Sequence, residues 1–249
     1  MKIEVYTLAN NEERLMPYII RHYSRFAKVI ILENNSTDRT CEIASAMGAE
    51  IWKYNIPDEL NDQIHIDIKN NCWKESKADW VIVCDADEFI YHPDIVNFLS
   101  KTTATIFCPR LFNMYSERFP TTEGQIYDEI NMGVEGGGKI NLWRPSEIRE
   151  IDFAVGCHNA RPVGNVVFGI DSRRTNGLFQ GKPTTPINQI LTLHMRYLSK
   201  QYLIERSARA GKRLSKLNRQ KGWGYHMNFS AEQIGSDYDR EIKKAIRVL

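Results

Sequence analysis

The first 110 residues alternate short β-branched segments with segments of helical periodicity, and this alternation constrains the fold more than any other feature. Strand-like segments are expected at 3–8, 28–33, 50–56, 79–89 and 104–108, with helical segments between them at 10–26, 36–48, 62–78 and 94–100. The run WVIVC at 80–84 is apolar at every position, as in a parallel strand that is covered on both faces. We therefore predict an α/β fold with an open mixed, mostly parallel sheet flanked by helices.

The alternation stops near residue 109. The segment 109–139 is irregular, aromatic and glycine-containing, so we expect a long loop or an inserted segment there. A further strand is expected at 140–145, followed by short strands and turns over 146–190. The chain from Leu198 onward has a basic, helical pattern, which predicts a C-terminal helical extension.

Composition places the chain among ordinary globular proteins. Of its 249 residues, 42% are hydrophobic and 26% are charged, and the formal net charge is only +2, so no general affinity for nucleic acid is expected. The longest apolar runs have four or five residues, far short of the roughly 20 that span a membrane. The five cysteines include no Cys-x-x-Cys pair, and no signal-peptide pattern opens the sequence, so we expect a cytoplasmic protein with reduced thiols.

Polar residues follow three of the expected strands, at the point where each strand ends. These clusters are ANNEE at 9–13, ENNSTD at 33–38 and DADE at 85–88. Because the carboxyl ends of parallel strands meet at one edge of a sheet, the three clusters are expected to converge there. The sequence therefore predicts a ligand site at this edge.

Asp85, Asp87 and Glu88 give that edge its chemistry. Mg²⁺ and Mn²⁺ prefer oxygen ligands, and Mg²⁺ commonly combines one or two carboxylates with phosphate oxygens of a substrate. The alternative is that an aspartate caps the following turn and Glu88 faces water. An EF-hand loop starting at Asp85 would need glycine where Ile90 stands, and an aspartyl phosphatase usually continues into Thr or Val, so a metal–diphosphate site fits better.

The segments ENNSTDRT (33–40) and DADEF (85–89) resemble two motifs of family-two glycosyltransferases, and DADEF resembles the form found in one small subgroup. The resemblance is good over 1–110 and looser over KINLWRP, GCHNARP and LTLHMRYLS. It implies the nucleotide-sugar-binding GT-A fold, a UDP-, GDP- or dTDP-sugar donor, and Mn²⁺ or Mg²⁺ as cofactor. It also implies inversion at the anomeric carbon.

The same resemblance implies roles for individual residues. Asp85 would lie near the donor ribose and the metal, and Asp87 would bind the metal directly. Glu33 and Asn34 would face the nucleotide base and ribose, and either Lys69 or Asn70 would lie beside the donor.

Histidines and a catalytic base complete the expected site. The resemblance implies that a C-terminal histidine, for which we choose His194, joins the metal or the diphosphate. It also singles out His158 in GCHNARP, which we include among the catalytic candidates. An inverting transferase needs a base for the acceptor hydroxyl. Asp152 and Asp171 are our candidates, with Glu135 and Glu123 as further acids in the same half of the chain.

Lys139 and the basic segment 200–221 each allow a functional and a purely structural interpretation. Lys139 in EGGGK either lies near the phosphates or follows a plain turn. The segment 200–221 holds eight Lys or Arg residues and one acid, so it is either a solvated helix face or a surface that contacts anionic lipid at the membrane.

We expect one enzyme that adds a single sugar to a glycan or lipid-linked acceptor in cell-surface polysaccharide assembly. Its catalytic domain would cover 1–197, with a donor-binding half at 1–110 and an acceptor-side half at 111–197, and the basic extension would cover 198–249. The alternatives are a sugar-phosphate nucleotidyltransferase and a non-enzymatic basic surface-binding module.

Overall fold

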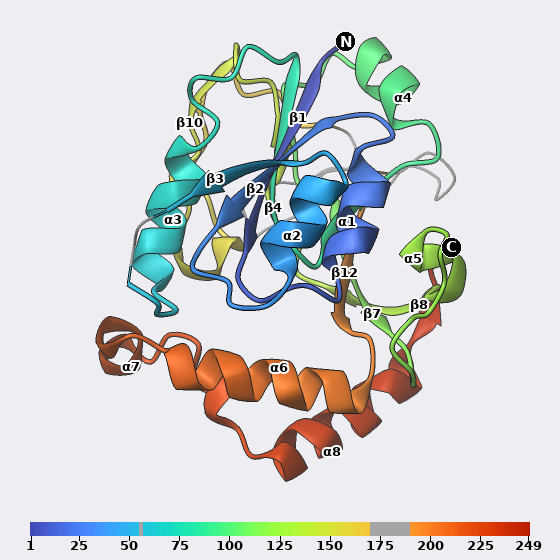
Figure 1. The fold of residues 1–249 in the computed structure, drawn as a ribbon. Helices are drawn as coiled ribbons and strands as arrows, with labels where there is room; N and C mark the ends of the chain where they lie inside the picture. The colour runs from blue at the N-terminus through green and yellow to red at the C-terminus, as the bar shows by residue number, and fades with distance from the viewer. Residues whose placement is uncertain (55–56, 170–189) are drawn as a thin grey trace.

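The computed structural model describes residues 1–54, 57–169 and 190–249 (Figure 1). At its centre is a six-stranded sheet with the strand order β3-β2-β1-β4-β9-β6. Its four parallel strands are β1 (Ile3–Ala9), β2 (Lys28–Glu33), β3 (Glu50–Lys53) and β4 (Trp80–Asp85). Two short antiparallel strands, β9 (Leu142–Trp143) and β6 (Ile106–Phe107), complete one edge. The predicted mixed, mostly parallel sheet is confirmed.

Both faces of this sheet are buried, because helices cover each of them. Val5 of β1 packs in one hydrophobic cluster with Ile19 of α1 (Met16–Tyr23). The next residue, Tyr6, points to the opposite face and packs with Ile66 of α3 (Asp62–Asn71). This alternation explains why the central strands are apolar at consecutive positions.

A second sheet of five strands stands beside the first, in the order β13-β8-β7-β12-β5. Its strands are β5 (Glu88–Tyr91), β7 (Arg110–Tyr115), β8 (Met132–Gly136), β12 (Leu191–Tyr197) and β13 (Ile246–Arg247). Of the two alternatives expected for 109–139, the long loop is wrong, since β7 and β8 pair antiparallel across that segment. The main partner of β7 is β12, some eighty residues later, so the local pattern carried little of this pairing.

The DADE segment connects the two sheets. β4 ends at Asp85, a turn contains Ala86 and Asp87, and β5 begins at Glu88 in the second sheet. The single strand expected over 79–89 is therefore two strands. Glu88 pairs in register with His194 of β12. This junction places three acidic side chains between two sheets.

The remaining elements are short, except in the C-terminal part. They are α2 (Thr40–Ala46), α4 (Ile95–Lys101), α5 (Ile126–Glu129), β10 (Ile148–Glu150), η1 (Val155–Cys157), β11 (Val163–Gly164), α6 (Lys200–Arg213), α7 (Lys216–Lys221), η3 (Tyr225–Asn228), α8 (Ala231–Glu241) and η4 (Ile242–Lys244). The helical C-terminal extension is thus present. Figure 1 shows α6 running beneath the sheet, with α8 packed below it. Ser199 starts α6, because its Oγ accepts a hydrogen bond from the Tyr202 N–H at 3.1 Å.

Candidate active site

The carboxyl ends of β1, β2 and β4 lie side by side, as the sequence predicts. Ala9 of β1 is in register with Glu33 of β2, and Leu8 of β1 is in register with Asp85 of β4. The backbone N–H of Asn34 continues this pairing by donating to the Ala9 carbonyl at 3.1 Å. The three polar clusters therefore converge at one edge of the central sheet.

A pocket of about 380 Å³ opens at this edge. One side is formed by the strand ends and α3, and the other by α6 and residues 224–227 of the C-terminal part. Its charged lining comprises six Lys or Arg residues and four Asp or Glu residues: Lys69, Lys139, Arg196, Arg206, Arg209, Arg213, Glu12, Asp62, Asp85 and Asp87. The excess of positive charge favours an anionic ligand.

Asp85 is held by two lysines from different parts of the chain. Its Oδ1 lies 2.6 Å from Nζ of Lys69 in α3, and its Oδ2 lies 3.1 Å from Nζ of Lys139. Desolvation by itself raises the pKa of Asp85, but the two ammonium groups outweigh it and hold that pKa below its usual range. Asp85 is therefore ionised at neutral pH and keeps about a third of its side chain exposed.

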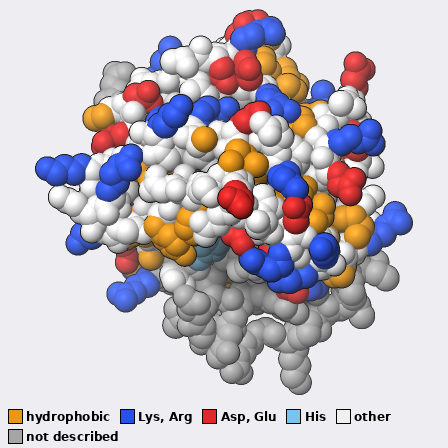
Figure 2. Space-filling view, turned by 90° about the horizontal axis from the view of Figure 1, so that it is seen from below, with side chains coloured by type: hydrophobic (Ala, Val, Ile, Leu, Met, Phe, Trp, Pro, Cys, Tyr) orange, Lys and Arg blue, Asp and Glu red, His pale blue; other side chains and the backbone are white. Residues whose placement is uncertain are grey.

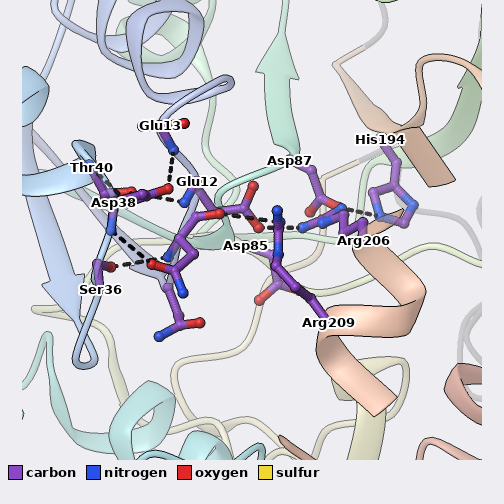
Figure 3. A network of polar contacts seen from close by, with 12 residues as sticks. Glu12, Glu13, Ser36, Asp38, Thr40, Asp85, Asp87, His194, Arg206 and Arg209 are labelled. Atoms are coloured by element: carbon purple, nitrogen blue, oxygen red, sulfur yellow. Dashed lines mark hydrogen bonds and ion pairs between the residues drawn. The ribbon is translucent and has the colours of Figure 1, made fainter. Parts of the chain in front are cut away.

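Asp87 is held from the C-terminal part of the chain. Arg206 of α6 forms an ion pair with its Oδ2, and Nε2 of His194 lies 3.4 Å from the same oxygen. Burial raises the pKa of Asp87, but Arg206 and His194 lower it well below its usual value. Arg206 also bonds Oε1 of Glu12 at 2.8 Å, so its guanidinium bridges two buried carboxylates (Figure 3).

His194 has a fixed orientation. Its Nδ1 donates to Oδ1 of Asn113 at 2.8 Å, across the register pair that joins β12 to β7. This contact directs the other ring nitrogen, Nε2, toward Oδ2 of Asp87 at 3.4 Å. An imidazole nitrogen beside a carboxylate oxygen is a pair of donor atoms that a divalent cation can share once the ring nitrogen is deprotonated.

Glu88, which the sequence left between a site role and a solvated one, is almost completely buried. Its Oε1 lies 2.5 Å from Nζ of Lys139, and its Oε2 accepts the backbone N–H of Asp85 at 3.1 Å. Glu88 therefore fixes Lys139 and the backbone of the turn, and Lys139 in turn touches Asp85. The sequence placed Lys139 either near the phosphates or after a plain turn. In the structure Lys139 lines the pocket.

Three of the other predicted residues lie outside the pocket, whereas a fourth belongs to its lining. Asn34 lines it, whereas the Glu33 carboxylate accepts the backbone N–H of Ser36 and is not among the lining residues. Asn70 points elsewhere, since its Oδ1 accepts the Phe153 N–H at 3.1 Å, so Lys69 is the member of that pair at the pocket. Asp152 is exposed and outside the pocket.

Of the remaining candidates, the described acids lie outside the pocket and the second histidine lines it. Glu123 and Glu135 are exposed and outside the pocket, and Glu135 pairs with Arg110 at 3.0 Å. His158 lines the pocket, and partial burial together with the charge of Lys139 lowers its pKa. Asp171 lies outside the described residues.

The sequence missed Glu12 and the arginines of α6. Arg206, Arg209 and Arg213 recur at helical spacing, which puts them on one face, and all three line the pocket. Arg213 pairs with Asp58 at 2.8 Å, and Arg209 donates to the Asn11 carbonyl at 3.2 Å. The spacing was visible in the basic run, but only the docking of α6 shows that this face is turned toward the strand ends.

The donor atoms can be compared with what a divalent cation requires. Within the part of the chain that the structure describes, no three His, Cys, Asp or Glu side chains are grouped to hold a metal by themselves. Mg²⁺ needs fewer protein ligands when phosphate oxygens complete its shell. Oδ2 of Asp87 and Nε2 of His194, 3.4 Å apart, could supply two ligands to a cation that binds together with a diphosphate, on the condition that Arg206 releases Asp87.

The sequence matches the model of one protein family, glycosyl transferase family 2, over residues 10–158. The chain belongs to glycosyl transferase family 2. In this family-two protein, the matched segment contains the strand ends of β2 and β4, the Asp85–Asp87 turn, Lys69 and Lys139. It stops before β12 and α6, which supply His194 and Arg206.

Two solved structures match part of this chain. Glucosyl-3-phosphoglycerate synthase from Mycobacterium tuberculosis, in complex with Mn²⁺, UDP and phosphoglyceric acid, is 17% identical, with a TM-score of 0.40 over 63% of this chain and 61% of that one. TarS from S. aureus is 14% identical, with a TM-score of 0.38 over 59% of this chain and 29% of that one. The chain thus spans less than two thirds of either, and the family assignment does not depend on them.

A comparison with curated proteins finds no significant match. Among the described helices of this family-two protein, none has the length and apolar character needed to cross a membrane.

Proposed function

We propose that this family-two protein is a metal-dependent, inverting glycosyltransferase that takes one sugar from a nucleotide-sugar donor. The observation that carries the proposal is the turn after β4, where Asp85 and Asp87 face a pocket lined by an excess of Lys and Arg. Such a site suits a sugar nucleotide, because negative charge builds on the departing diphosphate during glycosyl transfer. The DADEF subgroup assignment is part of this proposal.

The chain's own residues divide the work on the donor. Asp87, with Asp85 and His194, would hold Mn²⁺ or Mg²⁺, which when bound neutralises charge on the leaving diphosphate. Lys69 and Lys139 are buried cations beside Asp85, and their Nζ atoms are placed to attract phosphate oxygens. Asn34, at the end of β2, is available for the nucleoside.

On the acceptor side we propose His158 as the group that takes the proton from the attacking hydroxyl. It is the described residue among our catalytic candidates that lines the pocket. Its lowered pKa keeps the imidazole neutral at pH 7, so it can accept a proton. Asp152, exposed and outside the pocket, has no such support.

The acceptor is proposed to be a glycan or lipid-linked sugar in cell-surface polysaccharide assembly, reached from the cytoplasm. The division into a catalytic domain at 1–197 and an extension at 198–249 also stays a prediction. The pocket adds that part of the extension, α6, is a wall of the site.

Membrane contact through 200–221 has less support than the sequence suggested. Three of the eight basic residues face the pocket, Lys200 pairs with Asp239 at 2.6 Å, and Arg219 donates to two backbone carbonyls. Lys212, Lys216 and Lys221 are exposed. On the face seen in Figure 2, basic side chains are interspersed with acidic and hydrophobic ones. We propose at most weak peripheral contact.

Calorimetry with UDP, GDP and dTDP, each with and without Mn²⁺, tests the donor half of this proposal. We expect one nucleotide to bind tightly only when Mn²⁺ is present. A hydrolysis screen with sugar derivatives of that nucleotide then identifies the donor. If none of the three nucleotides binds in either condition, the proposal is wrong.

A further inference from the structure

We propose that Arg206 is a built-in counter-cation, which neutralises Asp87 in the free protein and moves to the diphosphate when metal and nucleotide bind. The inference deepens the proposed function and rests on it for the identity of the ligands. It makes metal binding and nucleotide binding depend on each other through one side chain of the C-terminal helix α6.

The contact that carries the inference is made at one oxygen. Oδ2 of Asp87 is the atom that faces Nε2 of His194 at 3.4 Å, and it is also the atom that the Arg206 guanidinium contacts. Figure 3 shows Arg206 reaching Asp87 from α6, with His194 on its other side. The guanidinium therefore contacts the same carboxylate oxygen that a metal shared by Asp87 and His194 would bind.

Charge and burial explain why a cation stands there. The side chains of Asp87 and Glu12 are only 4% and 10% exposed, so neither can stay ionised without a partner. Asp85 has two lysines, whereas Asp87 and Glu12 share the single guanidinium of Arg206. Arg206 thus supplies the positive charge that a divalent ion would bring.

The fork of Arg206 allows it to leave Asp87 without losing every partner. Nη1 contacts Asp87, and Nη2 is held separately by Glu12 at 2.8 Å. A cation on Asp87 repels the guanidinium, which can pivot about the Glu12 contact into the pocket that Arg206 already lines. There its freed N–H groups suit phosphate oxygens. Because coupling between ligands is reciprocal, the nucleotide must then raise the affinity for the metal by the same factor as the metal raises that for the nucleotide.

Titration with Mn²⁺ alone, followed by the paramagnetic resonance of the free ion, tests the first half of the switch. We compare the wild type, Arg206→Gln, and Arg209→Gln as a matched control. Arg209 lies one turn further along α6 and lines the same pocket, but its guanidinium contacts the Asn11 carbonyl rather than Asp87. We expect Arg206→Gln to tighten Mn²⁺ binding by about tenfold or more, the effect expected of a close charge pair, and Arg209→Gln to change it much less.

The second half is tested by repeating the titration with saturating UDP, or with GDP or dTDP if calorimetry selects one of those. The nucleotide should increase Mn²⁺ affinity strongly in the wild type and clearly less in Arg206→Gln. If both substitutions tighten Mn²⁺ binding equally, the effect comes from lowering the positive charge of the pocket in general and not from the Arg206–Asp87 contact. That result would overturn the proposal. Unchanged Mn²⁺ affinity in Arg206→Gln would overturn it directly.

Glu12→Gln keeps the proposal testable if Arg206→Gln does not fold. With Glu12 neutral, Asp87 is the one carboxylate among the described residues that still pairs with Arg206. Mn²⁺ binding without nucleotide should therefore weaken by about tenfold. Unchanged or tighter binding contradicts the switch. Failure of the proposed function looks different: no nucleotide binds even with Mn²⁺, whereas failure of the switch leaves nucleotide binding intact and Mn²⁺ affinity independent of Arg206.

Discussion

Nζ of Lys139 lies 2.5 Å from Oε1 of Glu88, a side chain that is only 1% exposed. The same ammonium lies 3.1 Å from Asp85, so the pair links the first and last acids of the DADE segment. A buried carboxylate that loses its partner is strongly destabilising, by about 3–5 kcal/mol. We therefore expect Lys139→Met to lower the free energy of unfolding by roughly that amount, measured with urea.

The double variant Lys139→Met/Glu88→Gln measures how much of the loss in unfolding free energy comes from the ion pair itself. Removing both charges should recover a large part of the loss, since no uncompensated carboxylate then remains at position 88. Strict additivity of the two single effects would show that the ion pair does not couple them.

A second prediction concerns acid stability and His22. This ring is buried, its Nε2 donates to the Ile90 carbonyl at 3.0 Å, and burial lowers its pKa to about 3. Between pH 6.5 and about 3 the unfolded chain binds a proton at this site and the folded protein does not. The free energy of unfolding should therefore fall as pH falls across this window, by up to about 1.4 kcal/mol per pH unit from His22.

His22→Gln isolates that contribution. The variant should be less stable than the wild type at pH 7, but its stability should fall less steeply between pH 6.5 and 4. Urea unfolding at several pH values measures both slopes, and parallel slopes would contradict the assignment.

Replacement of His158 tests the acceptor side. If His158 accepts the acceptor proton, His158→Asn should lower kcat by about 10²–10⁴-fold. Mn²⁺-dependent affinity for the nucleoside diphosphate should change little. Because the pKa of His158 is lowered, the wild-type rate attributable to it should be level above pH 6.5 and fall only at more acidic pH. A variant with full kcat would exclude His158 as the base.

The basic surface gives a fourth prediction. Vesicles containing anionic lipid should bind the protein weakly, because three exposed lysines of 200–221 are free of the pocket and of the contacts described for their neighbours. Each contributes about 1 kcal/mol near such a surface. Substitution of Lys212, Lys216 and Lys221 by Ala should abolish sedimentation with these vesicles. Tight binding that survives the substitutions would place the contact elsewhere.

The edge of the sheet with the three polar clusters could be predicted from the sequence, because the pattern of strands and helices that places it is local. Parallel strands place their carboxyl ends together, so the positions of Asp85, Asn34 and the loop after β1 followed from the alternation of strands and helices. The pairing of β7 with β12 was missed for the opposite reason. β7 is joined to the sheet chiefly by β12, and a pairing over eighty residues leaves no periodic signature in either strand alone.

The ion pairs of the site depended on tertiary packing. The arginines of α6 have the same spacing on a solvated helix as on a pocket wall, so Arg206 was assigned to a basic tail. Glu12 sits in a cluster that was recognised as polar, but its partner lies 194 residues later. Asp85 and Asp87 were found because their motif is contiguous, and their roles stay proposals.

The central claim is that Asp87 binds a divalent metal together with a nucleoside diphosphate. Calorimetry with the nucleotide selected by the wild type, with and without Mn²⁺, tests it in Asp87→Asn, with Asp239→Asn as an exposed control from the Lys200 pair. We predict that Mn²⁺-dependent binding is lost in Asp87→Asn and kept in Asp239→Asn. Mn²⁺-dependent binding of wild-type strength in Asp87→Asn would contradict the account.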